Sequence, residues 1–83
     1  MKYLVLTIRK PQFDTVHVSA HYEFLKSLRD RGILEQAGPF TDRSGGAYVI
    51  QAENFGAARE IADHDPLHIH DCSDVTVREW DAS

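Results

Sequence analysis

The sequence predicts an α+β protein of the ferredoxin-like class, with elements in the order β-α-β-β-α-β. Strand-like segments rich in β-branched and aromatic residues open and close the chain, at 2–9 and 75–80. Segments with the helical spacing of apolar residues lie at 16–31 and 54–63. Between them, two apolar runs flank the polar stretch 41–46, the clearest hairpin signal in the chain. This order is that of a split βαβ unit, in which two helices cover one face of a four-stranded antiparallel sheet.

The length and composition indicate one globular domain, residues 1–83. Apolar residues make up 42% of the chain and charged residues 27%, which are the proportions of a folded rather than a disordered protein. A chain of this size can bury only a small core, and oligomerisation is a common remedy. We therefore expect a homodimer.

The charge and cysteine content limit the partners and the compartment. A net charge of -4, without a cluster of Lys or Arg, argues against nucleic acid or an anionic membrane as a partner. No apolar run is long enough for a transmembrane helix, and the N-terminus lacks the features of a signal peptide. The single cysteine, Cys72, cannot form an internal disulfide. We expect a cytoplasmic protein whose partner is a small-molecule ligand.

The first strand is predicted from Lys2 to Arg9, and Pro11 ends it. Both of its faces are largely apolar, so we expect one to lie against the helices and the other against a partner subunit. The face expected to point away from the helices carries six side chains: Tyr3, Val5, Thr7, Tyr48, Arg78 and Trp80.

The first helix is predicted from about 16 to 31, after a cap at Asp14 or Thr15 and before the stop signal Gly32. Its apolar stripe consists of Phe24, Leu25 and Leu28, continued at helical spacing by His17 and His21. His21 is therefore expected to face the sheet rather than water.

The remaining elements are predicted from the same signals. Strands are expected at Ile33–Phe40, Ala47–Ala52 and Val75–Trp80, and a helix at 54–63 with Asn54 as its cap. The inward side chains of that helix are expected to be Phe55, Ala58, Ile61 and Ala62. The Gly45-Gly46 pair is assigned to the hairpin turn. Asp65-Pro66 ends the helix, because a residue before proline avoids helical geometry, and 68–73 is expected to be irregular.

Several phrases of the sequence, in their order and spacing, resemble the YciI-like family along nearly the whole chain. They are MKYLVL at the start, SAHYEFL with His21, RGILEQAGP, then Asp42, Gly45 and Gly46, DPL from Asp65 to Leu67, and VREW near the end. The resemblance implies a dimeric α/β-barrel fold, in which two ferredoxin-like sheets lie face to face. It also implies an active site built on a His–Asp pair, at His21 and Asp65. The chain departs from the family pattern after Pro66, where it reads LHIHDCSD instead of Phe, a short turn and a Gly-containing apolar stretch.

His21 and Asp65 are the candidate catalytic residues. A carboxylate that accepts a hydrogen bond from one ring nitrogen fixes the tautomer of an imidazole and leaves the other nitrogen as a base. Asp65 is a suitable partner because Pro66 restricts the backbone beside it. The alternative is a core histidine that is satisfied by a structural carboxylate. We predict a hydrogen bond between the two, direct or through one water, at the floor of a pocket bounded by Gly38 and Pro39.

The residues assigned to substrate binding are Arg9, Gly38, Pro39, Phe40 and Pro66. Gly38 lets a ligand approach the backbone closely, and Pro39 stiffens the wall. Arg9 offers a cation to an anionic substrate group, but a solvated charge at the strand end is the favoured interpretation. Asp42 either faces a ligand or caps its own turn, and the cap is favoured.

A histidine-rich run after the second helix is the candidate metal cluster. It contains His64, His68, His70, Asp71 and Cys72. Pro66 interrupts the i, i+4 spacing on which helical zinc motifs depend, so we predict no metal site. We also predict no cofactor, and Cys72 has no basic neighbour that would make it a nucleophile.

The first functional hypothesis is a small dimeric enzyme in which His21 is the general acid/base and Asp65 orients it. Removal of a proton with loss of a leaving group fits a site without a nucleophile or a cofactor motif, and one member of the family resembles a dehydrochlorinase of chlorinated hydroxyquinols. The substrate would be a small cyclic or aromatic metabolite, such as a hydroxylated aromatic or a lactone. The alternative is a non-catalytic dimer that binds a small ligand or another protein, with the His–Asp pair holding the fold.

Overall fold

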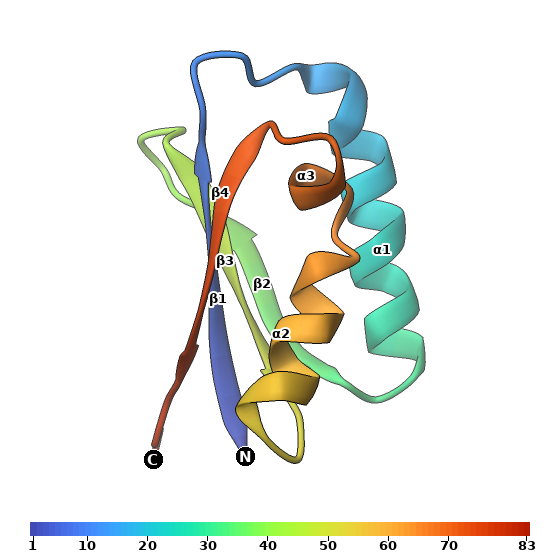
Figure 1. Ribbon diagram of the computed structural model, residues 1–83, viewed down its shortest axis with the longest axis vertical. Coiled ribbons are helices and arrows are strands. Elements are labelled where there is room, and N and C mark those ends of the chain that lie inside the picture. The colour runs from blue at the N-terminus through green and yellow to red at the C-terminus, as the bar shows by residue number, and fades with distance from the viewer.

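The computed structural model describes residues 1–83 and shows one antiparallel sheet with every helix on the same face (Figure 1). The strands are β1 (Lys2–Arg9), β2 (Leu34–Pro39), β3 (Gly45–Gln51) and β4 (Ser73–Glu79). The helices are the 3-10 turn η1 (Thr15–His17), α1 (Val18–Asp30), α2 (Phe55–Asp63) and α3 (Pro66–Ile69). The order β2-β3-β1-β4 places the first and third strands at the centre, which confirms the predicted ferredoxin-like topology. None of the helices has the length and hydrophobicity required to cross a bilayer.

Most of the side chains that were predicted to lie on the outer face of the sheet lie on the face that the helices cover. Four of the six side chains expected on the outer face are buried on the helix side instead: Tyr3, Val5, Thr7 and Tyr48. Val5 pairs with Tyr48 on one side and with Val77 on the other, so these three share the inner face. The prediction was wrong because both faces of β1 are apolar, and alternation alone does not then indicate which face is inward.

The face away from the helices is open and largely apolar. It carries Leu4, Leu6, Ile8, Ala47 and Val49, together with Arg78 and Trp80, which lie where they were predicted. Ile8 is 41% exposed and Trp80 is 47% exposed. An open apolar face on so small a protein is typical of an association surface.

The first helix begins in two stages. The Asp14 side chain accepts a hydrogen bond from the backbone N–H of Val16, which confirms one of the two predicted caps. The α-helix proper starts only at Val18, after the 3-10 turn. Leu25 and Leu28 are buried against the sheet, and the stripe that they define also carries His21.

The second long helix, α2, is capped as predicted. Asn54 accepts a hydrogen bond from the N–H of Ala57, and Ala58 and Ala62 are fully buried. Phe55 differs from the prediction, since it is 52% exposed and its ring meets Tyr3 edge to face at 6.4 Å. As the first residue of the helix, it lies at the margin of the core rather than inside it.

A short helix, α3, occupies part of the stretch that was predicted to be irregular. Asp65 caps it by accepting from the N–H of Leu67, and Pro66 is its first residue. The same proline that ends one helix can begin the next. At the first position of a helix, a backbone N–H would have no acceptor within the helix, so proline loses nothing by lacking it. The last strand also begins earlier than predicted, at Ser73.

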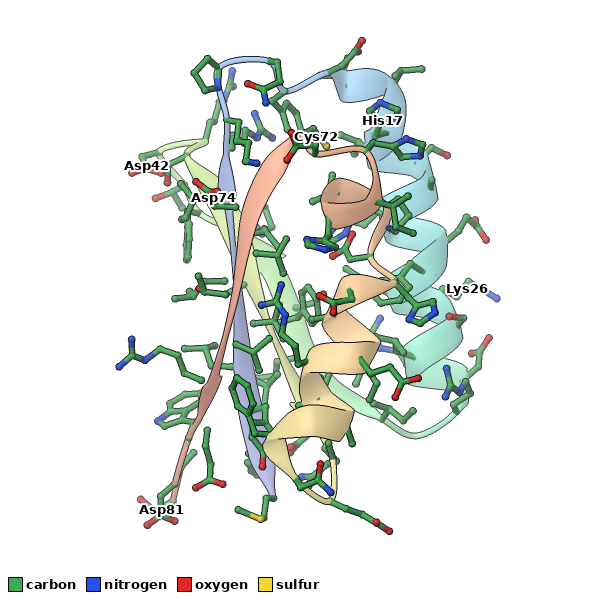
Figure 2. All side chains as sticks on the ribbon, viewed as in Figure 1. His17, Lys26, Asp42, Cys72, Asp74 and Asp81 are labelled. Carbon is green, nitrogen blue, oxygen red and sulfur yellow. The ribbon has the colours of Figure 1, made fainter.

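The paired glycines belong to strand β3 rather than to the hairpin turn. A Cβ atom at Gly45 would overlap the carbonyl oxygen of Thr7, and one at Gly46 would lie 2.7 Å from the carbonyl oxygen of Gly38. Their role is therefore the close approach of neighbouring strands. The turn itself precedes them, and Figure 2 shows Asp42 there, on the side away from the helices. Asp42 accepts from the N–H of Ser44, which confirms the predicted cap.

Candidate active site

A cavity of about 250 Å³ lies between α1 and the sheet. One wall is formed by α1, which contributes His21 and Leu25, and the opposite wall by β3, which contributes Tyr48. The edge strand β2 borders it with Gly38 and Pro39, as predicted. The cavity therefore opens where the first helix passes over the hairpin formed by β2 and β3.

The His21–Asp65 hydrogen bond predicted from the sequence is present. His21 Nδ1 lies 2.9 Å from Asp65 Oδ1. The His21 side chain is 14% exposed, whereas the Asp65 side chain is fully buried. The helical spacing of α1 turns His21 toward the sheet, and the chain reversal between α2 and α3 places Asp65 beneath it.

Asp65 accepts three hydrogen bonds. In addition to His21, Leu67 N–H donates to Oδ1 at 2.9 Å, and the Tyr48 hydroxyl donates to Oδ2 at 2.9 Å. An ionised carboxylate only accepts, so this set of partners matches the charged form of Asp65. The partners also satisfy a charge whose burial would otherwise be costly.

Tyr48 is the member of the site that the sequence did not reveal, because the strand faces were assigned in reverse. It is 2% exposed. Burial, followed by the nearby charge of Asp65, raises the pKa of the Tyr48 hydroxyl far above the ordinary value for tyrosine. The phenol therefore remains a hydrogen-bond donor and does not act as a base. The need of a buried carboxylate for more than one donor is the signal that could have pointed to a nearby hydroxyl.

The second ring nitrogen of His21 is available to a ligand. With Nδ1–H donating to Asp65, the neutral imidazole carries its lone pair on Nε2. Nε2 forms no hydrogen bond within the protein. Since His21 lines the cavity, a molecule bound there can meet this nitrogen.

The residues assigned to substrate binding divide into two groups. Arg9, Gly38 and Pro39 line the cavity, and the Arg9 guanidinium carbon lies 4.2 Å from the centre of the Phe13 ring. Phe40 and Pro66 are not among the lining residues. Phe40 is where the chain leaves β2 for the turn, and Pro66 belongs to the first turn of α3, so both lie beyond the cavity wall.

The histidine-rich run does not form a cluster. His64 Nδ1 contacts the carbonyl of Glu60 at 2.8 Å, His68 lies 3.5 Å from Asp63, and the ring of His70 stacks on His17 at 4.1 Å. No three His, Cys, Asp or Glu side chains are arranged to hold a metal ion.

Cys72 is buried, and its thiol donates to the carbonyl of Leu67 at 3.4 Å. Burial raises the pKa of this thiol, which disfavours the thiolate that a nucleophile requires. The structure thus gives Cys72 a packing role.

Fold and site together define a class: a small ferredoxin-like α+β protein with a His–Asp pair at the wall of a cavity. The model of the YCII-related domain matches residues 1–81. The chain is also 46% identical to the uncharacterized protein YjpA of Bacillus subtilis (strain 168) over 78 residues. The aligned region covers 94% of this chain and 92% of YjpA. The chain belongs to the YCII-related family, which confirms the resemblance seen in the sequence.

Two solved structures have the same fold at low sequence identity. The 5-chloro-2-hydroxyhydroquinone dehydrochlorinase TftG of Burkholderia phenoliruptrix AC1100, in complex with 2,5-dihydroxybenzoquinone, is 18% identical with a TM-score of 0.78, over 100% of this chain and 96% of that one. Muconolactone isomerase is 16% identical with a TM-score of 0.65, over 96% of this chain and 88% of that one. At these identities the similarity establishes the fold.

Proposed function

We propose that the chain is a small homodimeric enzyme in which His21 acts as a general acid/base, oriented by Asp65, on a small cyclic or aromatic metabolite. The observation that carries this proposal is the 2.9 Å hydrogen bond from His21 Nδ1 to Asp65 Oδ1 at the wall of a cavity. It leaves Nε2 as an unoccupied proton acceptor facing the space where a ligand would bind.

The reaction class is a lyase-type elimination, in which a substrate loses a proton and a leaving group. Nε2 of His21 takes the proton, and the electrons of the broken bond form a new π bond as the leaving group departs with its own electron pair. The imidazolium then faces the Asp65 carboxylate, which stabilises its charge. Tyr48 holds the other carboxylate oxygen and keeps the pair aligned. Transfer of the proton to the leaving group or to water restores the neutral imidazole.

The structural neighbours support the choice of substrates. One is a dehydrochlorinase of a hydroxylated aromatic ring and the other is an isomerase of a lactone. Small aromatic and lactone compounds are therefore the first candidates for a turnover screen. Such a screen, run on the wild-type protein and on His21→Ala in parallel, tests the proposal.

The homodimer is part of the proposal. The outer face of the sheet exposes Ile8 of β1 and Trp80, with Leu4, Leu6 and Ala47 half-buried between them, and a second copy is the natural cover for it. Two sheets packed face to face would also enlarge a core that is small in a single chain. A cytoplasmic location completes the proposal and can be checked by cell fractionation.

The alternative function, a non-catalytic ligand-binding dimer, is favoured by the contacts of Asp65 itself. Its carboxylate caps α3 and anchors Tyr48, so it would hold the fold even if no reaction took place. The two functions differ in what His21→Ala changes: in an enzyme this variant loses turnover and stays folded, whereas in a binding module with a structural pair it loses stability.

A further inference from the structure

The cavity is lined by positive charge although the chain as a whole is acidic. Its net charge is -4, yet Arg9, Lys26 and Arg29 line the cavity and no Asp or Glu does. Lys26 extends from α1 away from the sheet (Figure 2) and pairs with Asp30 at 3.4 Å, so its charge does not face the cavity and the two arginines remain. Neither arginine has a carboxylate within ion-pair distance. Uncompensated cations around a cavity indicate that its ligand carries negative charge.

Arg9 is held in place without using its hydrogen-bond donors. It is the last residue of β1, and its guanidinium carbon lies 4.2 Å from the centre of the Phe13 ring, a cation–π contact. None of its side-chain N–H groups donates to a protein acceptor. The planar fork of donors is therefore free for a ligand, and its geometry matches a carboxylate.

Ser73 stands directly beside Arg9. The β1–β4 register pairs these two residues, so their side chains project from the same face of the sheet. Ser73 lines the cavity, is 3% exposed, and its Oγ is the only buried side-chain nitrogen or oxygen without a hydrogen-bond partner. An orphaned hydroxyl is costly in a folded protein, and an oxygen of a bound ligand would satisfy it.

We infer that Arg9 and Ser73 form a carboxylate-binding subsite at the end of the cavity beyond His21. The ligand is a small single-ring carboxylate, with its acidic group on this pair and its ring on the apolar wall near Leu25. A carboxylate fits better than a phosphate, because one guanidinium and one hydroxyl match two oxygens and a single charge. Arg9 lies four residues along β1 from Val5, the neighbour of Tyr48, a rise of about 13 Å that the arginine side chain and one ring can span. That this carboxylate is the substrate of the enzyme rests on the proposed function. Binding of a carboxylate to Arg9 and Ser73 does not.

The test is an NMR titration of the ¹⁵N-labelled full chain with benzoate and, separately, with neutral benzamide. Benzoate is expected to bind more tightly and to shift the amides around Arg9 and Ser73. Arg9→Gln and Ser73→Ala should each weaken benzoate binding about tenfold, as expected for loss of a hydrogen bond to a charged group, and should change benzamide binding little. Arg31→Gln is the matched control, since it removes the same charge from an exposed residue outside the cavity.

Several results would overturn the subsite: no benzoate binding at millimolar concentration, equal affinities for benzoate and benzamide, or equal weakening by Arg9→Gln and Arg31→Gln. Ser73→Ala should not lower the melting temperature of the free protein, because it removes an unsatisfied hydroxyl. Unchanged benzoate affinity or lost stability in that variant would remove Ser73 from the subsite. Benzoate binding by His21→Ala separates the two proposals, since that variant should keep the subsite while losing turnover.

Discussion

The Tyr48 hydroxyl donates to Asp65 Oδ2 at 2.9 Å, on the carboxylate oxygen that His21 does not contact. Each oxygen of the buried carboxylate thus has its own side-chain donor, one from β3 and one from α1. The hydrogen bond from Tyr48 opposes rotation of the Asp65 carboxylate about its Cβ–Cγ bond. Tyr48 therefore positions the Asp65 carboxylate, which in turn positions the His21 ring.

Tyr48→Phe tests this link. The change leaves Asp65 Oδ2 buried without its donor, which should lower the free energy of unfolding by about 1–3 kcal/mol. Urea unfolding measures the effect. Tyr22→Phe is the control, because Tyr22 is 54% exposed and its hydroxyl forms no hydrogen bond within the protein. Equal stability of the two variants would show that the Tyr48–Asp65 bond contributes nothing.

Stability should also fall at alkaline pH through Tyr48. Its pKa is raised in the folded protein by burial and by the charge of Asp65, whereas a tyrosine of the unfolded chain titrates near pH 10. A raised folded pKa means that the contribution is complete below about pH 10 and is lost as the pH rises further. Urea midpoints measured across this range should fall more steeply for the wild type than for Tyr48→Phe. Parallel curves would contradict the prediction.

His21→Ala should remove most of the turnover of any true substrate. Loss of a general base typically lowers the rate by ~10²–10⁴-fold. The variant should remain a folded dimer, as judged by circular dichroism and light scattering. His17→Ala is a suitable control, because His17 is outside the cavity and stacks on His70. Full activity in a folded His21→Ala protein would exclude this histidine from the mechanism.

The proposed dimer should dissociate when charge is placed on the open sheet face. Leu6 lies on the central strand β1 and points away from the helices, so Leu6→Lys would bury a charge between two copies. Ser19→Lys adds the same charge on the exposed side of α1 and serves as the control. Sedimentation velocity should show a monomer for the first variant and a dimer for the second. A wild-type protein that is monomeric at micromolar concentration would rule out the dimer.

Gly45→Ala should impair folding strongly, because the added Cβ would overlap the Thr7 carbonyl oxygen on β1. The backbone of a sheet cannot yield as a flexible side chain can, so the strands must separate locally. Gly38→Ala is the matched control, since a Cβ there meets nothing within 4 Å. Thermal unfolding of the two variants measures the difference. Similar melting temperatures would contradict the close approach of β1 and β3.

The element order and the direction of His21 could be predicted because each depends on local chemistry. Capping residues, the proline and the helical spacing of apolar residues mark the elements, and that spacing places His21 on the stripe of Leu25. The inner face of β1 could not be predicted, since both faces are apolar and long-range packing selects between them. Tyr48 was missed for the same reason, and the roles of Gly45 and Ser73 depend on strand pairing that no local pattern encodes.

The hydrogen bonds of Asp65 also determine how late in folding the site can form. His21 is 44 positions from Asp65 in the sequence, and Tyr48 is 17 positions from it. Both halves of the chain must therefore be docked before the carboxylate has all of its hydrogen bonds. Contacts between distant parts of a sequence form late, because the entropy of closing long loops opposes them. An intermediate that retains α1 or the β2–β3 hairpin alone would lack the oriented imidazole. If the proposed activity is found, its recovery after dilution from denaturant should therefore follow the return of secondary structure, because it requires the final docking step.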